Sequence, residues 1–304
     1  VDGTRTAANV PTDTFEQLAT IRGARILLVD DNDLNQEVAT DLLTDAGFVV
    51  DLAENGQIAV DKVRAAAYDI VLMDMQMPVM DGVTATREIR KEALFNELPV
   101  VAMTANAMQG DRDRCMAAGM NDHVAKPIEP EDLWRVLLKW IKPRGSIPAA
   151  AELKPHAAED APLPSGIAGL DTANALRRVL GKKPLYFSML RKFVAGQKSV
   201  VDEIRAALAG MAWDTAERLA HTLKGVSGNI GAVTLLPLAE KLELAITERR
   251  PRQEIEARLD ELKVPLEYLI AQLEQKLPEQ AARKSVAVDP KELMAVCDRL
   301  GLLL

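Results

Sequence analysis

Five polar residues of this sequence each stand at the end of a short apolar run, and their types could hold a metal ion and a phosphoryl group. They are Asp30, Asp31, Asp74, Thr104 and Lys126. Three carboxylates in one pocket repel one another by roughly 4 kcal/mol per pair at 4 Å and an effective dielectric near 20, so they need a cation. Mg²⁺ suits them because it prefers oxygen ligands and often bridges to phosphate. The lysine and the threonine would then meet phosphoryl oxygens; alternatively, Lys126 forms only a salt bridge and Thr104 only caps a helix.

The apolar runs before these residues predict strands that are buried on both faces, as in a parallel sheet. The predicted strands span residues 25–30, 48–52, 70–73, 99–103 and 122–125, and helical periodicities follow each of them. Five such units predict an α/β doubly wound parallel sheet of five strands, and right-handed crossovers place the carboxyl ends of all strands at one edge. The five polar residues should therefore converge at that edge, where open α/β sheets bind ligands.

The composition changes along the chain in a way that predicts two domains joined by a linker. Residues 1–23 are polar and unpatterned and are assigned to an N-terminal linker, whereas residues 24–142 hold the predicted sheet. Residues 143–168 are rich in proline and alanine and form a second linker. Residues 169–278 show only helical periodicity, and residues 279–304 form a C-terminal tail that is expected to begin a further segment.

One helix of the second domain carries a histidine on its polar side. Its apolar and small residues recur at steps of three and four, whereas His221, Lys224 and Gly225 fall on the opposite side, which predicts that the histidine faces solvent. A glycine within a helix costs about 1 kcal/mol relative to alanine. Gly225 and Gly228 beside an exposed histidine therefore indicate that the surface of a partner comes close. In the last helix of this domain, Pro265 predicts a kink or a break.

Composition and charge argue against several classes of function. The net charge of -8 argues against a nucleic-acid surface, and no apolar run approaches the roughly 18 residues of a transmembrane helix, so no membrane contact is expected. Cys115 and Cys297 lie far apart and lack metal-ligand spacing. A GxxxxGK[ST] motif and a recognisable ATP-binding kinase domain are both missing, so the chain should not phosphorylate itself from ATP. We expect a cytoplasmic protein, or the soluble end of a membrane-bound one.

The first domain resembles the receiver domain of bacterial response regulators over about residues 24–142. The resemblance rests on four motifs in order: Val29-Asp30-Asp31-Asn32, Met73-Asp74-Met75-Gln76-Met77-Pro78, Met103-Thr104-Ala105 and Ala125-Lys126-Pro127. It implies a flavodoxin-like fold in which Asp74 is phosphorylated. The implied Mg²⁺ ligands are Asp30, Asp31, Asp74 and the backbone carbonyl of Gln76, and Thr104 and Lys126 are implied to bind the phosphoryl oxygens. Where the family usually has an aromatic residue, three positions before the lysine, this chain has His123, which either packs or acts as a general base.

The second domain resembles histidine-containing phosphotransfer (HPt) domains over about residues 168–278. The segment His221-Thr-Leu-Lys224-Gly225-Val-Ser-Gly228-Asn-Ile-Gly231-Ala232 carries this resemblance. It implies an all-α helical bundle with His221 as the phosphorylated imidazole. Lys224 is implied to be a cation near the phosphoryl group, and Gly225 to leave room for a receiver domain.

The order of the two domains resembles the C-terminal end of a bacterial hybrid sensor histidine kinase and implies a phosphorelay. Asp74 would accept a phosphoryl group from the phosphohistidine of a kinase domain, and His221 would carry one towards a downstream receiver. Two alternatives stay open. One is a metal-dependent aspartyl-phosphate hydrolase, although Gln76 occupies the position where that class usually has a second aspartate. The other is a bundle that only docks partners, with His221 incidental.

Overall fold

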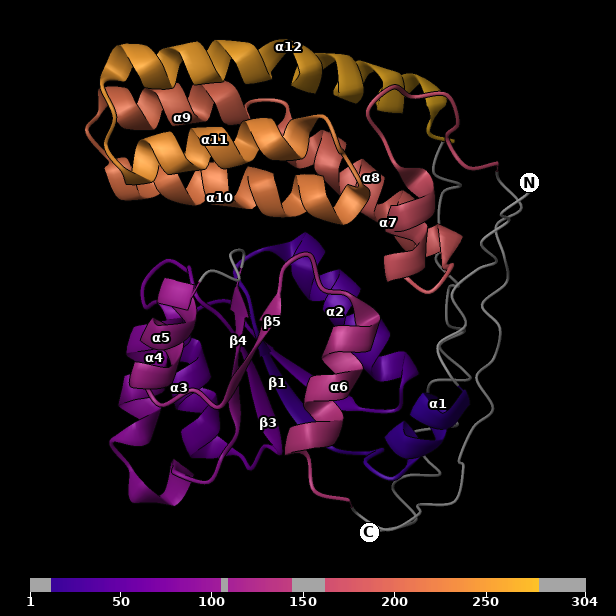
Figure 1. Cartoon of the computed structure of the whole chain (residues 1–304), viewed down its shortest axis with the longest axis vertical. Coiled ribbons are helices and arrows are strands. Elements are labelled where there is room, and N and C mark those ends of the chain that lie inside the picture. Colours follow the sequence, from indigo (N-terminus) through magenta and orange to yellow (C-terminus); the bar gives the residue numbers. More distant parts are fainter. Residues whose placement is uncertain (1–11, 105–108, 144–161, 279–304) are drawn as a thin grey trace, which may run out of the picture.

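A parallel sheet forms the centre of the first domain in the computed structural model, which describes residues 12–104, 109–143 and 162–278 (Figure 1). Its strands are β1 (Arg25–Val29), β2 (Val49–Ala53), β3 (Ile70–Asp74), β4 (Val100–Thr104) and β5 (Asp122–Ala125). They pair in the order β2-β1-β3-β4-β5, and every pair is parallel. Every residue of β3 and β4 is buried, which explains why these strands read as continuous apolar runs. The predicted fold class is confirmed.

Helices cover both faces of the sheet. They are α1 (Thr12–Ala19), α2 (Asp33–Asp45), α3 (Gly56–Ala65), α4 (Gly82–Arg90), α5 (Gln109–Ala117) and α6 (Pro130–Trp140), with a 3₁₀ turn η1 at Ala93–Phe95. In β1, Ile26 and Leu28 pack on the side of α2 and α6, whereas Leu27 and Val29 pack on the side of α3 and α4. Successive side chains of a strand point to opposite faces, so this one strand contributes to both cores.

The loop that follows β3 turns back tightly on the end of the strand. Asp81 caps α4 by accepting a hydrogen bond from the Thr84 amide at 2.7 Å. A Cβ atom added to Gly82, the first residue of α4, would lie 2.1 Å from the backbone oxygen of Asp74. Only glycine fits there, and its absent side chain lets α4 start close beside Asp74.

The second domain is a helical bundle. Its helices are α7 (Thr172–Arg178), α8 (Lys183–Gln197), α9 (Val200–Ala209), α10 (Trp213–Ile230), α11 (Leu235–Thr247) and α12 (Arg252–Lys276). The helix α10 packs against α8, α9 and α11, and α12 lies on the side of the bundle away from the sheet (Figure 1). Gly231 ends α10 in the left-handed conformation, with φ 79°, and a Cβ there would come within 2.5 Å of the backbone oxygen of Asp171.

Two local predictions differ from the structure. Residues 1–23 were expected to be an unpatterned linker, but Thr12–Ala19 form α1, which packs on α6 and buries Leu18. Pro265 was expected to kink or break the last helix, and no break occurs, because α12 continues through it from Arg252 to Lys276. Residues 144–161, most of the predicted second linker, and the whole predicted tail at 279–304 lie outside the described residues. Within the described ranges, no helix is both long enough and apolar enough to cross a membrane.

Candidate functional site

Three carboxylates meet at the carboxyl edge of the sheet. Asp30 and Asp31 follow β1 directly, and Asp74 is the last residue of β3. Each offers an oxygen, and these oxygens all lie within 4.8 Å of one another. Asp30 and Asp74 are almost fully buried, and Asp31 is partly buried. The topology therefore brings together the three carboxylates that the sequence placed at strand ends.

Lys126 enters this acidic pocket from the end of β5. Its Nζ lies 2.7 Å from an oxygen of Asp30 and 2.7 Å from an oxygen of Asp74, and only 7% of its side chain is exposed. Its backbone amide donates to the backbone oxygen of Thr104 at 2.7 Å, which joins the ends of β4 and β5. Thr104 is buried. The salt bridge that sequence analysis left as an alternative for Lys126 is thus present, and it does not exclude a later contact with a phosphoryl group.

Helix α2 holds Asp30 in place, a role that sequence analysis did not assign. The Asn32 amide donates to Oδ1 of Asp30 at 2.9 Å, and Nδ2 of Asn35 lies 3.1 Å and 3.3 Å from the two carboxylate oxygens. Nε2 of Gln36 donates to the backbone oxygen of Asp30 at 2.5 Å. The only sequence signal for these residues was their place in the first turn after a strand end.

The other predicted pocket residues lie at its rim. The Gln76 amide donates to Oδ1 of Asp74 at 3.4 Å, which places the backbone of this exposed residue beside the pocket. His123 is partly buried on β5, and its Nδ1 lies 3.8 Å from the carboxylate of Asp122. His123 therefore lies beside the acidic residue that precedes it on β5.

The charges of the pocket shift the pKa values of its members. Burial raises the pKa of the Asp31 carboxyl to about 6; the charges of Asp74 and Asp30 act in the same direction, and Lys126 and Arg218 oppose them. Burial also raises the pKa of Asp74, against the opposing charges of Lys126 and His221. The pKa of Lys126 is raised because the attraction of the two carboxylates outweighs the effect of burial. One lysine therefore does not balance the negative charge of the pocket.

His221 belongs to a second polar cluster, between α10 and α11. Its Nδ1 lies 2.5 Å from Oε1 of Glu243, and Lys224 forms an ion pair with the other oxygen of the same carboxylate. Burial alone would raise the pKa of Glu243, but His221 and Lys224 lower it. Glu243 thus fixes the histidine ring through Nδ1 and leaves Nε2 as the ring nitrogen for chemistry. Sequence analysis missed Glu243, whose only signal was its position beside the apolar stripe of α11.

The predicted solvent exposure of His221 is wrong. Only 12% of its side chain is exposed, and Lys224 and Gly228 are buried. The side of α10 opposite the bundle core faces the carboxyl edge of the sheet (Figure 1). Helical periodicity identifies that side as polar, but it contains no information about which polar neighbours cover it.

Several contacts place the face of α10 that carries His221 over the acidic pocket. Arg218, three residues before His221, reaches within 4.0 Å of the Asp31 carboxylate. Nδ2 of Asn229 donates to Oδ1 of Asn35 at 2.7 Å, and Asn35 in turn contacts Asp30. His221 is near enough to Asp74 for its charge to lower the pKa of that carboxyl. The two candidate phosphoryl carriers therefore face each other across one interface.

The glycines after His221 differ in their surroundings. A Cβ at Gly228 would lie 3.4 Å from Cδ of Pro127 in the first domain, so the backbone of α10 lies close to that domain there. The backbone oxygen of Gly228 also accepts a hydrogen bond at 2.7 Å from Arg178, whose Nε lies 2.6 Å from Glu129. A Cβ at Gly225 would meet nothing within 4 Å, so the space that was predicted there is open.

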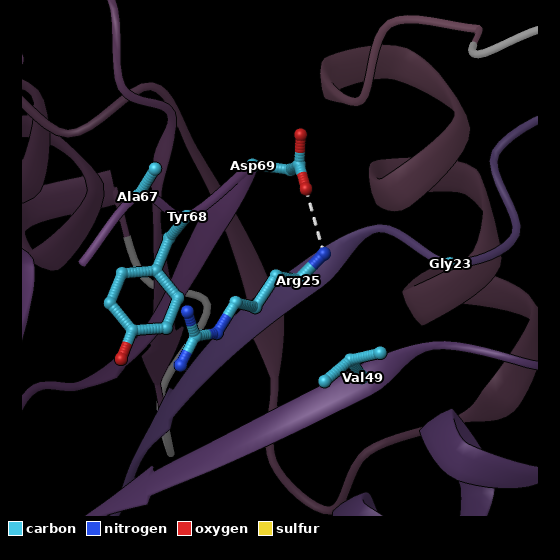
Figure 2. Close-up of a pocket in the computed structure, with 6 residues that line it drawn as sticks. All are labelled: Gly23, Arg25, Val49, Ala67, Tyr68 and Asp69. Carbon is cyan, nitrogen blue, oxygen red and sulfur yellow. Dashed lines mark hydrogen bonds between the residues drawn. The ribbon is translucent and has the colours of Figure 1, made fainter. Parts of the chain in front are cut away.

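A pocket of about 300 Å³ lies at the opposite, amino-terminal edge of the sheet (Figure 2). Its lining residues are Gly23, Arg25, Val49, Ala67, Tyr68 and Asp69. The Arg25 amide donates to Asp69 at 2.7 Å, and Arg25 and Tyr68 both donate to Asp51 at 2.9 Å. These polar groups satisfy one another, which indicates a structural role at the sheet edge remote from Asp74.

Comparisons with known proteins agree with this geometry. Residues 26–138 match the family model of the response regulator receiver domain, and residues 188–277 match that of the Hpt domain. The signal transduction histidine-protein kinase BarA of Escherichia coli (strain K12) is 33% identical over 237 residues, which are 78% of this chain and 25% of BarA. The sensor protein GacS of Pseudomonas syringae pv. syringae is 36% identical over 236 residues, 77% of this chain and 26% of GacS. The chain thus spans about a quarter of the length of these relatives.

Solved structures give matches to the first domain. The receiver domain of sensor histidine kinase PA1611 from Pseudomonas aeruginosa PAO1, described with a magnesium ion in its active site cleft, is 47% identical and covers 39% of this chain and 97% of its own, with a TM-score of 0.37. The receiver domain of Ssk1 in complex with the phosphotransfer protein Ypd1, both from Saccharomyces cerevisiae, gives 28% identity, 40% and 90% coverage and a TM-score of 0.38. From the family matches and the kinase relatives, the chain belongs to the phosphorelay proteins of two-component signal transduction and carries a receiver domain followed by an Hpt domain.

Proposed function

We propose that Asp74 and His221 pass a phosphoryl group between the two domains of this chain. Asp74 would first take the group from the phosphohistidine of a histidine kinase domain, and His221 would later hand it to a downstream receiver. The observation that carries the proposal is the docking of α10 on the carboxyl edge of the sheet, with Arg218 within 4.0 Å of Asp31 and Asn229 hydrogen-bonded to Asn35 at 2.7 Å.

The transfer step can be written with the residues at hand. Nε2 of neutral His221 forms a bond to phosphorus as the bond from phosphorus to the Asp74 oxygen breaks, and Asp74 leaves as a carboxylate. The proton on Nδ1 stays in its hydrogen bond to Glu243, whose negative charge stabilises the positive charge that develops on the ring. Lys126 lies beside Asp74, and its ammonium group would stabilise the negative charge of the phosphoryl oxygens during the transfer. The catalysis is therefore positioning and charge stabilisation.

The donor set of the acidic pocket fits Mg²⁺. Its carboxylate oxygens lie within 4.8 Å of one another, and the single lysine that contacts them, Lys126, leaves room for a further positive charge. We propose that Asp30, Asp31 and Asp74 hold the ion together with the backbone carbonyl of Gln76. When bound, Mg²⁺ would neutralise charge on the phosphoryl oxygens. Thr104 would then serve as a hydroxyl partner of the same oxygens.

The proposal includes the bounds of the two domains and their location in the cell. We assign the receiver to residues 24–142, extended by α1, and the Hpt domain to residues 169–278. We also propose that both work in the cytoplasm as the end of a longer hybrid kinase, because the relatives BarA and GacS are sensor kinases about four times as long as the matched region.

The experiment loads the whole chain with labelled acetyl phosphate in the presence of Mg²⁺. Acyl phosphates are labile in base, whereas phosphoimidazoles are stable in base and labile in acid. Treating portions of the same sample with base or with acid therefore distinguishes label on Asp74 from label on His221. The wild type should accumulate base-stable label, whereas Asp74→Asn should carry none and His221→Gln should carry only base-labile label. Base-stable label in the His221→Gln variant would refute the assignment of this histidine.

A further inference from the structure

One face of α2 carries an acidic stripe, which we define as Glu37, Asp41 and Asp45. These residues follow one another at steps of four and therefore line up along one side of the helix. Like charges at this spacing destabilise an isolated helix, so the stripe is unfavourable for the receiver alone. In the described parts of the chain, the ion pairs of all three carboxylates reach the Hpt domain.

The matching face belongs to α8 and the residue before it. Lys182 is the residue just before α8 and forms ion pairs with both Asp41 and Asp45. Nearly three turns further on, Nζ of Lys192 lies 3.0 Å from Oε2 of Glu37. Ser188 donates to the other oxygen of Glu37 at 2.8 Å. The later residue of α8 therefore contacts the earlier residue of α2, which means that the two helices run antiparallel. Each basic residue lies opposite an acidic residue of α2.

The end of this contact formed by Lys182, Asp41 and Asp45 lies apart from the reacting groups. At about 1.5 Å per residue, Asp41 and Asp45 stand roughly 12–18 Å along α2 from its first turn, where the helix contacts Asp30. The acidic stripe and the two lysines contain no atom that the proposed transfer uses. They can therefore set which receiver docks without changing the chemistry of a docked pair.

We propose that Lys182 and Lys192 recognise receivers by the acidic stripe of the helix that follows the first strand, which is α2 in this chain. The partner that fits this surface is a receiver with carboxylates at the positions of Glu37, Asp41 and Asp45, and the chain's own receiver is the occupant in this structure. A receiver with basic residues at these positions is rejected, because like charges then face each other. This inference rests on the proposed transfer between Asp74 and His221 and adds the element that selects the partner.

A charge exchange in the whole chain tests the proposal. The variants are Lys182→Glu, the double variant Asp41→Lys with Asp45→Lys, and the triple variant that combines them. The control is Lys263→Glu, which makes the same charge change on α12, on the far side of the bundle (Figure 1). Each variant is loaded with labelled acetyl phosphate at low ionic strength, where charge pairs are least screened. The measured quantity is the rate at which base-stable label appears on His221.

We expect Lys182→Glu and the double variant each to slow the transfer by about tenfold or more, because two attractions become two repulsions. The triple variant should recover most of the wild-type rate, and Lys263→Glu should keep it. Loading of Asp74 should be the same in every chain, since no variant touches the acidic pocket. Small-angle scattering should show a larger radius of gyration for the two slow variants only.

Two outcomes overturn the proposal. One is a wild-type rate in Lys182→Glu, and the other is a triple variant that stays slow although circular dichroism and thermal unfolding show it to be folded. A failure of the proposed function looks different, because the wild type itself would then place no base-stable label on His221. The compensating exchange excludes a merely structural role for Lys182, since such a role would not be rescued by charges on α2.

Discussion

Replacing Asp31 with asparagine should stabilise the metal-free receiver above about pH 6. Burial raises the pKa of this carboxyl from 3.8 to about 6 in the folded protein. Between these values the folded protein holds a proton that the unfolded chain has already lost. Stability therefore falls as the pH rises through this range, and the loss is complete above about pH 6.

The size of the effect follows from the same shift. A gap of about two pKa units, at 1.36 kcal/mol per unit, gives about 3 kcal/mol as the upper limit of the destabilisation. Asparagine has nearly the same shape and cannot ionise, so Asp31→Asn should recover up to this amount at pH 8 and almost nothing at pH 4.

The assay is urea unfolding in a chelating buffer at pH 4, 6 and 8, with hydrogen exchange of the buried β3 amides to report the receiver domain alone. Asp33→Asn, an exposed position in the first turn of α2, is the control and should show no such pH-dependent gain. Excess Mg²⁺ should stabilise the wild type by about 2.7 kcal/mol at a hundred times its dissociation constant, and the variant by less. Equal stability of Asp31→Asn and wild type at pH 8 without metal would refute the reasoning.

Three further predictions concern single side chains. Lys126→Ala leaves two buried carboxylates without their shared partner and should cost about 3–5 kcal/mol of receiver stability in chelating buffer; unchanged unfolding would contradict its buried ion pairs. Glu243→Gln keeps a hydrogen bond to His221 but loses its charge, so rapid-quench measurement should find transfer about tenfold slower, and a wild-type rate would show that the charge is not used. Gly228→Val should push α10 away from the receiver and slow the transfer with little loss of bundle stability, whereas the matched control Gly225→Ala should be tolerated because a Cβ there meets nothing within 4 Å.

The sequence predicted most of the acidic pocket because each inference used only residues that are neighbours in the sequence. A short apolar run fixes a buried strand, and the residue that follows it lies at the strand's carboxyl end. Parallel topology then brings Asp30, Asp31 and Asp74 to one edge, as the structure shows.

What the sequence left open depends on residues that are far apart along the chain. Glu243 lies 22 positions from His221, and Asn229 lies 194 positions from Asn35. The same limit explains the error over the exposure of His221, because periodicity shows which side of α10 is polar but not what covers it.

The sequence by itself determined the parallel sheet, the helical second domain and the order of the domains, because these follow from local patterns of apolar and polar residues. The roles of Asp74 and His221 as candidate carriers came from the resemblance of their motifs to known families. Only the tertiary structure decided that α10 lies over the acidic pocket, that Glu243 holds the histidine ring, and that Lys182 joins the bundle to the acidic stripe of α2. The physical reason is that a charge or a hydrogen bond acts over a few ångströms of space whatever the sequence separation of its partners, and the folding of the chain alone sets those distances.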